Sequence, residues 1–443
     1  LSYNLIVKST GLVNKTAINQ QRSIKSIHRY DLIDKHIDNY LQHLQQKNRD
    51  AAINVLSEAE LVANEMEIQT SERIGIDLVS YYRSTPITTA EMLIEARALR
   101  KEIESSIRLD LTSANLQKIT QAKKIFEQLS AKCETERTNI QIIKYFSKNN
   151  RFTEALAIIN NSLTTAVNAK HLFNQAQLLM WQGHCLSGMA KFDEAAKVLE
   201  ESIRLGYQLD IPEAILGSFM VLAGIYYVTD NNAAAFEFAR KALELARPIN
   251  HPYTIRLLHI TGLTALNLGH QTLAETCLQD AIKLAERQED YISLAYSQIF
   301  LGILYNELGR TNDAKESFIS ALVNANKLTD ILVRTDLETV ITGYYARVAM
   351  LAGEIDHAIK LYTKALDLAA KANIQQNLML SQLHQGLGES LARKGDYKRA
   401  KNELLTAVAL DHKARKSLEE NNSLLTFAAS HKSSIEVLRT FPH

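Results

Sequence analysis

The side chains of this chain best suited to nucleophilic or redox chemistry are its three cysteines. Cys133, Cys185 and Cys277 lie far apart, are odd in number and form no CxxC pair. A disulfide framework and a zinc site are therefore not expected, and each cysteine lies in a helical pattern where it can pack as a small apolar residue. His184 adjoins Cys185, but adjacent residues of a helix point in different directions, so they do not make a nucleophile–base pair.

The thirteen histidines are dispersed along the chain. His28, His36 and His43 could share one helix face, but steps of eight and seven residues exceed a single turn, too far for joint metal ligation. No GxxxxGK[ST], GxGxxG, HExxH, GxSxG or EF-hand pattern occurs, and Gly386-Leu387-Gly388 lacks a third glycine. The sequence thus predicts no enzyme activity, no cofactor and no metal.

The composition favours helices arranged in an elongated array. Among 443 residues there are only 16 glycines and 5 prolines, while residues that helices accept readily are abundant. The formal net charge of +1 gives no overall field that would attract nucleic acid or an anionic membrane. No apolar run approaches the ~18–20 residues that span a bilayer, and no signal-peptide pattern is present.

A repeat organises most of the chain. Seven related segments, among them KFDEAAKVLEES and GRTNDAKESFISAL, each carry an anchor alanine. The anchors are Ala155, Ala195, Ala235, Ala274, Ala314, Ala358 and Ala400, separated, by subtraction, by 40, 40, 39, 40, 44 and 42 residues. A larger apolar residue or alanine follows each anchor by four positions and a small residue by seven, which places all three on one helical face.

A second helix precedes each anchor helix and carries a small residue about twelve positions before the anchor. Examples are Gly302, Gly388 and the pair Ala223-Gly224, which would let two antiparallel helices approach closely. Glycines also occur at the predicted connecting turns, where a left-handed backbone conformation costs glycine little. They are Gly269, Gly309, Gly353 and Gly395.

These features resemble the tetratricopeptide repeat (TPR), and the segment NELGRTNDAKESFISAL matches it best. The repeat here is about six residues longer than the usual 34-residue unit, which is similar to the sensor arms of large bacterial transcription activators and signalling ATPases, and to kinesin light chains. The resemblance implies an all-α fold, a right-handed superhelical solenoid of antiparallel helix pairs.

The phased repeats occupy residues 135–410, and the remainder is less regular. Residues 27–134 form helices, with an amphipathic helix beginning at Ile27 and a degenerate hairpin around Ala52, but Ala90 and Ala122 are rival anchors there. Residues 1–26 form a basic extension, and residues 411–443 are predicted to hold a capping helix, about 411–430, and a tail.

The N-terminal extension is basic and has no acidic residue before Asp31. A solvated tail, a segment close to a membrane and an arm for nucleic acid are three readings that the sequence leaves open. The chain begins at Leu1 rather than at methionine, as a fragment of a larger protein or a processed form would. We expect a cytoplasmic location, with an exported or membrane-tethered fragment as the alternative.

The resemblance also implies a binding groove, because the first helix of each TPR pair lines the concave face. Carried onto this sequence, its positions are Lys144, Lys148, Met180, His184, Val221, Ile225, Val228, Arg256, His259, Leu263, Leu266, Asn267, Tyr296, Ile299, Ile303, Asn306, Arg347, Met350, Gln385, Glu389 and Arg393. The middle of this set is apolar, and large exposed apolar patches usually mark an interface. Lys144, Lys148, Arg347 and Arg393 would flank it and favour acidic residues at the ends of a partner.

The sequence therefore predicts a scaffold or sensor module that binds a protein or peptide, such as an amphipathic helix, and that regulates a fused output domain. Self-packing is an equal alternative, in which the same side chains contact neighbouring repeats or a terminal helix of this chain. A small-molecule effector site would use His184, His259, Arg256 and Asn267. RNA binding is disfavoured because the groove residues do not recur between copies, and the Lys/Asn set that grips chaperone C-termini is not found.

Overall fold

A computed structural model of the chain describes residues 16–105, 113–209, 212–248, 250–251, 253–374 and 377–420. These residues form helices and turns, without a β-strand among them. The chain divides into two compact units, residues 1–222 and 223–443, and the boundary falls inside helix α11 (Pro212–Val228). None of the described helices is long and apolar enough to cross a membrane.

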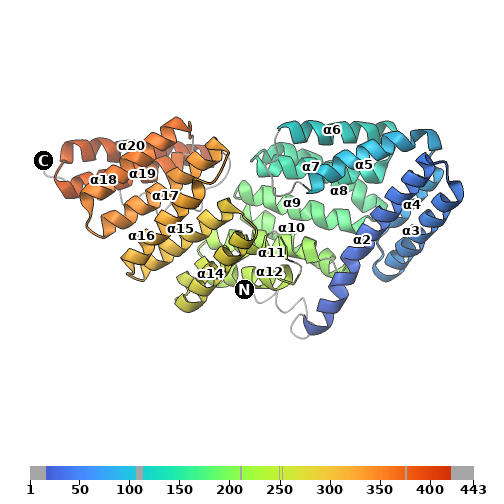
Figure 1. Cartoon of the computed structure of the whole chain (residues 1–443), viewed down its shortest axis with the longest axis horizontal. Coiled ribbons are helices and arrows are strands. Elements are labelled where there is room, and N and C mark those ends of the chain that lie inside the picture. Colours follow the sequence, from blue (N-terminus) through green and yellow to red (C-terminus); the bar gives the residue numbers. More distant parts are fainter. Residues whose placement is uncertain are drawn as a thin grey trace. The chain divides into compact units, whose positions relative to one another are not determined.

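The first unit begins with less regular helices and continues into the repeat. Its helices before α11 are α2 (Thr16–Gln45), α3 (Arg49–Thr70), α4 (Ile74–Ser84), the 3-10 helix η2 (Ile87–Thr89), α5 (Ala90–Ser105), α6 (Ser113–Gln128), α7 (Lys132–Lys148), α8 (Phe152–Ala169), α9 (Leu172–Gly188) and α10 (Phe192–Leu209). Figure 1 shows α2 and α3 side by side as the expected first hairpin, with Ala52 fully buried between the helices.

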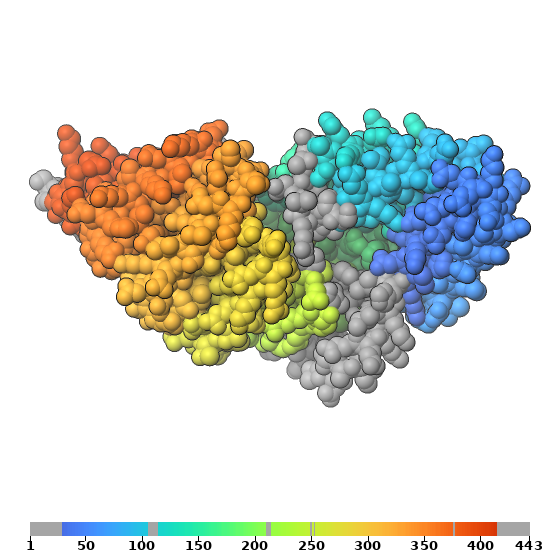
Figure 2. All heavy atoms as spheres, viewed as in Figure 1, coloured from blue at the N-terminus to red at the C-terminus, as the bar shows by residue number. Residues whose placement is uncertain are grey.

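The second unit consists of successive antiparallel helix pairs (Figure 1). Its helices after α11 are α12 (Asn232–Ala246), α13 (Thr254–Asn267), α14 (Gln271–Arg287), α15 (Tyr291–Glu307), α16 (Thr311–Ala325), α17 (Ile331–Leu351), α18 (Ile355–Lys371), α19 (Asn377–Lys394) and α20 (Tyr397–Glu420). In the space-filling view the residues from α14 to α20 form one continuous packed surface (Figure 2).

The predicted anchors are the centre of each pair. All seven anchor alanines lie in the second helix of a pair, and each is 0% exposed. The glycine twelve positions earlier faces the large residue that follows the anchor by four: a Cβ added at Gly302 would lie 2.8 Å from the Phe318 ring, and one at Gly388 would lie 2.7 Å from Leu404 Cγ. Close helix packing therefore depends on the absence of a side chain there.

The turn inside each pair has the left-handed conformation that the glycines predicted. Gly269, Gly309, Gly353 and Gly395 have φ between 70° and 89°. Two equivalent turns in the first unit adopt the same conformation with Asn150 and Ala190, at φ 58° and 52°. Five residues separate each turn residue from its anchor, so turn and anchor form one recurring local structure.

Two features of the ends differ from expectation. Helix α2 begins at Thr16, so residues expected to belong to the basic extension are helical. Residues 411–420 continue α20 instead of starting a separate capping helix, because no turn follows the last anchor helix; the rest of the predicted cap lies outside the described residues. Ala122 follows the anchor rule within α6, with Phe126 also fully buried four positions later, whereas Ala90 begins the preceding helix α5.

Candidate binding face of the second unit

The candidate reactive groups are placed for packing. Cys133, Cys185 and Cys277 are free and buried, and burial raises the pKa of each thiol, which disfavours the nucleophilic thiolate. Cys185 Sγ lies 3.1 Å from the Ser147 hydroxyl, within the first unit. Across the part of the chain that the structure describes, no group of three or more His, Cys, Asp and Glu side chains is arranged to hold a metal ion.

Uncovered residues recur at the same four positions on three first helices of the second unit. On α13, α15 and α17 they lie six and two residues before the small residue of the pair, and one and five residues after it. The small residues are Gly262, Gly302 and Ala346, and the uncovered ones are Arg256, Ile260, Leu263 and Asn267 on α13, Tyr296, Phe300, Ile303 and Glu307 on α15, and Val340, Tyr344, Arg347 and Leu351 on α17. We call these twelve residues, with Tyr227 and Val228 of α11, the second-unit face.

Five predicted groove residues are buried, and their assignment to an open groove is wrong. Val221 and Ile225 of α11 are 8% and 4% exposed, His259 is 9%, Ile299 is 0% and Met350 is 5% exposed. His259 and Ile299 lie three residues before the small residue, where the side chain turns toward the neighbouring pair. A difference of one residue rotates a side chain by about 100° around a helix, enough to exchange a buried position for an open one.

His259 illustrates what this position does. Its Nε2 lies 2.7 Å from the Ser297 hydroxyl on α15, and its ring meets the Phe300 ring edge-on at 5.0 Å between centroids. Burial lowers the pKa of His259 to about 3, so the ring is neutral and joins α13 to α15 as a core residue.

The other predicted groove residues fall into three groups. In the first unit, Lys144, Met180 and His184 are half-buried and Lys148 is exposed; burial and the nearby Lys148 lower the pKa of Lys144 to about 8. On α19, Gln385 donates to Glu389 at 2.8 Å, and Arg393 donates to the Met350 carbonyl at 3.2 Å. The remainder lie on or beside the second-unit face: Val228, Arg256, Leu263, Leu266, Asn267, Tyr296, Ile303, Asn306 and Arg347.

Sequence reasoning missed three aromatic residues of this face. Tyr227, Phe300 and Tyr344 were not among the predicted positions, although Phe300 and Tyr344 both lie two residues before the small residue of their pairs. Tyr227 is 38% exposed and Tyr344 37%. The same offset from the small residue on α13, α15 and α17 was the signal that would have found two of them.

Two aromatic side chains of this face contact each other on α15. Tyr296 stacks on Phe300, with ring centroids 6.3 Å apart. Partial burial raises the pKa of Tyr296, and the nearby Asp336 and Tyr344 of α17 raise it further. Tyr344 also adds to the burial that raises the pKa of Tyr227 on α11. Tyr344 is therefore within electrostatic reach of tyrosines on two other helices.

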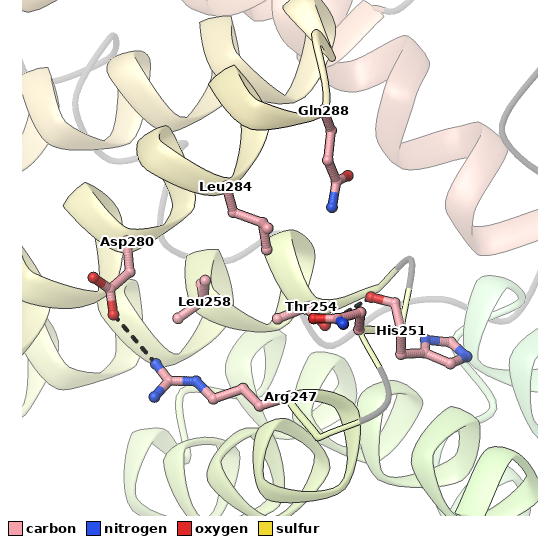
Figure 3. A pocket seen from close by; sticks show the side chains of 8 residues that line it. Arg247, His251, Thr254, Leu258, Asp280, Leu284 and Gln288 are labelled. Atoms are coloured by element: carbon pink, nitrogen blue, oxygen red, sulfur yellow. Dashed lines mark hydrogen bonds and ion pairs between the residues drawn. The ribbon is translucent and has the colours of Figure 1, made fainter.

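Two cavities among the described residues do not gather the polar groups predicted for a small-molecule site. Figure 3 shows a cavity of about 170 Å³ beside α12, α13 and α14, where Arg247 pairs with Asp280 at 3.4 Å and Thr254 donates to the His251 carbonyl. A cavity of about 360 Å³ in the first unit is lined by hydroxyls, amides and charged groups from α6, α7, α8 and the turn before α7. Neither contains His184, His259, Arg256 or Asn267.

Comparison with known proteins identifies the fold. Over 78% of this chain and 97% of the other, it is similar to the apo form of RapI, with TM-score 0.55 and 15% identity. It is also similar to a STAND protein with a tetratricopeptide repeat sensor, PH0952 from Pyrococcus horikoshii, over 86% of this chain and 57% of that one (TM-score 0.53, 15% identity). The fold is that of a tetratricopeptide-repeat array.

Other comparisons add nothing to this TPR-like assignment. No protein-family model matches the sequence, and no curated protein matches it. A Rap protein complexed with Competence and Sporulation Factor superposes at TM-score 0.49 with 14% identity over 78% of this chain and 99% of the other, too loosely to support an argument. At these identities the similarity concerns the fold, and function has to be argued from the surface.

Proposed function

We propose that this chain is a peptide-binding regulatory module and that the second-unit face is its binding surface. The observation that carries the proposal is the run of exposed and half-buried large apolar side chains on first helices that pack directly against one another, α13 on α15 and α15 on α17. Tyr296 is 38% exposed, Tyr344 37% and Leu351 51%. Exposed apolar surface of this extent usually marks an interaction site.

A peptide suits this face better than a compact ligand. The uncovered positions recur on successive helices at the same offset, so the surface extends across several pairs, as a segment of partner chain requires. Arg256 and Arg347 are exposed on it and would favour acidic groups at the ends of the segment. A sensor role is consistent with the tetratricopeptide sensor of the STAND protein, and we propose binding, not catalysis, as the activity.

Selection of a random 12-residue peptide library on the full chain tests the proposal. A face variant carries Leu263→Glu, Tyr296→Glu and Tyr344→Glu. Its control carries the same number of glutamates on second helices of the same unit, at Leu273, Ile319 and Leu405, which are 41%, 49% and 49% exposed. Circular dichroism first establishes that both variants remain helical.

Peptides selected on the intact chain are expected to bind the control variant and to lose at least tenfold in affinity for the face variant, about 1.4 kcal/mol. Equal binding to both variants would place the site elsewhere and overturn the proposal. Hydrogen exchange gives an independent measurement: a bound peptide should protect α13, α15 and α17 together, whereas protection of a single pair would favour a compact ligand.

A further inference from the structure

We propose that the cavity of about 360 Å³ in the first unit binds a free amino acid, and that Glu136 and Asn139 receive its ammonium group. The site belongs to the first unit and shares no residue with the second-unit face. It therefore goes beyond the proposed peptide binding, and each site can be tested without the other.

The cavity lies where α6, α7 and α8 meet (Figure 1). Its lining side chains are those of serine, threonine, asparagine, glutamate and lysine. Its volume falls within the range of about 300–1,000 Å³ that is typical of small-molecule sites. A small polar ligand therefore suits this cavity better than an apolar one.

Glu136 is the buried charged group of the cavity, with a side chain that is 8% exposed. Its Oε2 lies 2.9 Å from His171 Nδ1 and accepts from Asn174 Nδ2 at 2.9 Å. Its Oε1 has no hydrogen-bond partner among the described residues. The carboxylate is thus held in position through one oxygen and can accept from a ligand with the other.

Asn139 supplies a second acceptor from the same side of α7, three residues after Glu136. Its Nδ2 donates to the Ser162 hydroxyl of α8 at 3.3 Å, which orients the amide. Its Oδ1 is buried, and no group of the described residues donates to it. A buried acceptor without a donor is unfavourable, so this position favours a ligand that donates hydrogen bonds. An ammonium group has three donors and no acceptor, which matches this pair of oxygens.

The charges around Glu136 also favour a cation. Burial lowers the pKa of His171, but hydrogen bonds to its neighbours outweigh burial and raise the pKa to about 11, so the ring is charged. His171 is shared between Glu136 and Asp77, at 2.9 and 3.0 Å. Arg73 is shared in turn between Asp77 and Glu67, at 3.5 Å from each. Three carboxylates thus share two cations, and a ligand ammonium group would balance the third.

Lys132 favours an amino acid over a simple amine. It lines the same cavity from the first turn of α7, where its side chain is exposed. A simple amine would meet Lys132 as a like charge, whereas the carboxylate of an amino acid would pair with it. Free amino acids carry an ammonium group and a carboxylate on one carbon, so they can use both ends of the cavity lining on α7.

Isothermal titration calorimetry of the full chain with each of the common amino acids tests the proposal. We expect one amino acid, or a group with similar side chains, to bind with a Kd below about 1 mM. The N-acetyl derivative of that amino acid lacks the ammonium charge and should bind about 10- to 100-fold more weakly, as loss of charged hydrogen bonds predicts. The α-amide lacks the carboxylate and should bind about threefold more weakly, because Lys132 is exposed.

Variants of α7 and α8 locate the site, after circular dichroism has established that each remains helical. Asn139→Leu removes the acceptor and should weaken binding about tenfold, whereas Asn139→Asp keeps an acceptor and should remain within about threefold. Thr165→Trp fills part of the cavity and should abolish binding. Its matched control is Thr164→Trp, since both threonines are exposed on α8 and donate to the carbonyl four residues earlier, at 3.2 and 3.1 Å, but Thr165 is the one that lines the cavity.

Four results would each overturn the amino-acid site. The first is that no amino acid binds the intact chain, and the second is that the N-acetyl derivative binds as tightly as its parent. The third is that the α-amide binds as tightly as the parent, which would make the ligand a simple amine. The fourth is that Thr165→Trp and Asn139→Leu both leave the affinity unchanged. None of these results bears on the second-unit face, and a failure of the peptide selection would leave the amino-acid site intact.

Discussion

The two units differ in what they bury. The first unit encloses charged side chains among its helices: Glu72, Arg97, Arg100, Glu134 and Glu136 are all less than 9% exposed. Among the described residues of the second unit, Asp411 is the one acidic or basic residue buried to this extent besides the neutral His259. Its core is built from anchor alanines and the large apolar residue four positions later. A regular repeat can be packed by one local rule, and an irregular one needs long-range polar contacts.

The buried charges of the first unit form a network across α2, α5 and α7. Arg97 pairs with Asp34 at 3.0 Å, with Asp38 at 2.8 Å and with Glu134. Arg137 pairs with Asp34 as well. These arginines lower the pKa of Glu134 to about 2, against the burial that would raise it. Each carboxylate has its partners in one arrangement of these helices only, so the network defines the register of helices that no repeat aligns.

The largest expected effect comes from breaking this network. Glu134→Ala would leave Arg97 and Arg100 buried without their shared carboxylate, which costs about 3–5 kcal/mol of the free energy of unfolding. Urea denaturation followed by hydrogen exchange should show loss of protection in α2, α5 and α7. The matched control is Glu354→Ala, which removes a solvent-exposed ion pair to Lys315 in the second unit and should change stability little. If Glu134→Ala and Glu354→Ala lowered the free energy of unfolding by similar amounts, buried charges would be no more important in the first unit than exposed ion pairs are in the second.

Two histidines should give the units opposite responses to pH. His171 contacts Glu136 at 2.9 Å and Asp77 at 3.0 Å, and hydrogen bonds to Cys133, Glu136 and Asp77 outweigh burial and raise its pKa to about 11. The stabilisation that protonated His171 gives the folded state is complete below its unfolded pKa of about 6.5 and is lost as pH rises toward 11. Its charged hydrogen bonds contribute about 1.5–3 kcal/mol to the free energy of unfolding.

His259 has the reverse sign, because burial lowers its pKa to about 3. The unfolded chain takes up a proton below about pH 6.5 while the folded one does not, so the second unit loses stability as pH falls from about 6.5 toward 3.

The alkaline response expected from His171 is measured by hydrogen exchange at pH 6.5 and 9, which should show weakening in α4, α7 and α9 alone. His171→Gln should abolish that alkaline response, and an unchanged response would assign it to another group.

The sequence specifies these two kinds of packing with different success. The anchors, the small residues and the left-handed turns are local patterns, so seven pairs could be phased before the structure was known. The ion network joins residues such as Asp34 and Arg137, which are separated by 103 positions, and no local spacing indicates such partners. The predicted groove position Ile299 was wrong by a single residue, since Phe300 lies on the face instead. The neighbouring pair determines which side of a first helix is covered, and no local pattern indicates that.

The smallest expected effect concerns the turns that the two units share. Ala190 adopts φ 52° in the first unit, where the second unit has Gly269 at φ 80°. An L-residue in this conformation is strained by about 1–2 kcal/mol, and glycine avoids that strain. Because glycine also loses more conformational entropy on folding, only part of this strain energy appears as a gain in stability. Ala190→Gly should therefore stabilise the first unit by roughly 0.5–1 kcal/mol, and Gly269→Ala should destabilise the second by a similar or larger amount.

Thermal and urea unfolding of both variants measure the difference directly. Because the Cβ of an alanine at Gly269 would meet nothing within 4 Å, that change tests backbone strain without a packing clash. If the two substitutions have effects of opposite sign, the turn is one structure with one conformational requirement in both units, and the units differ in their cores alone. If Ala190→Gly is neutral or destabilising, the turn of the first unit does not favour glycine, and the two units differ in their turns as well as in their cores. They would then share the buried anchor alanine but not the conformational requirement of the turn.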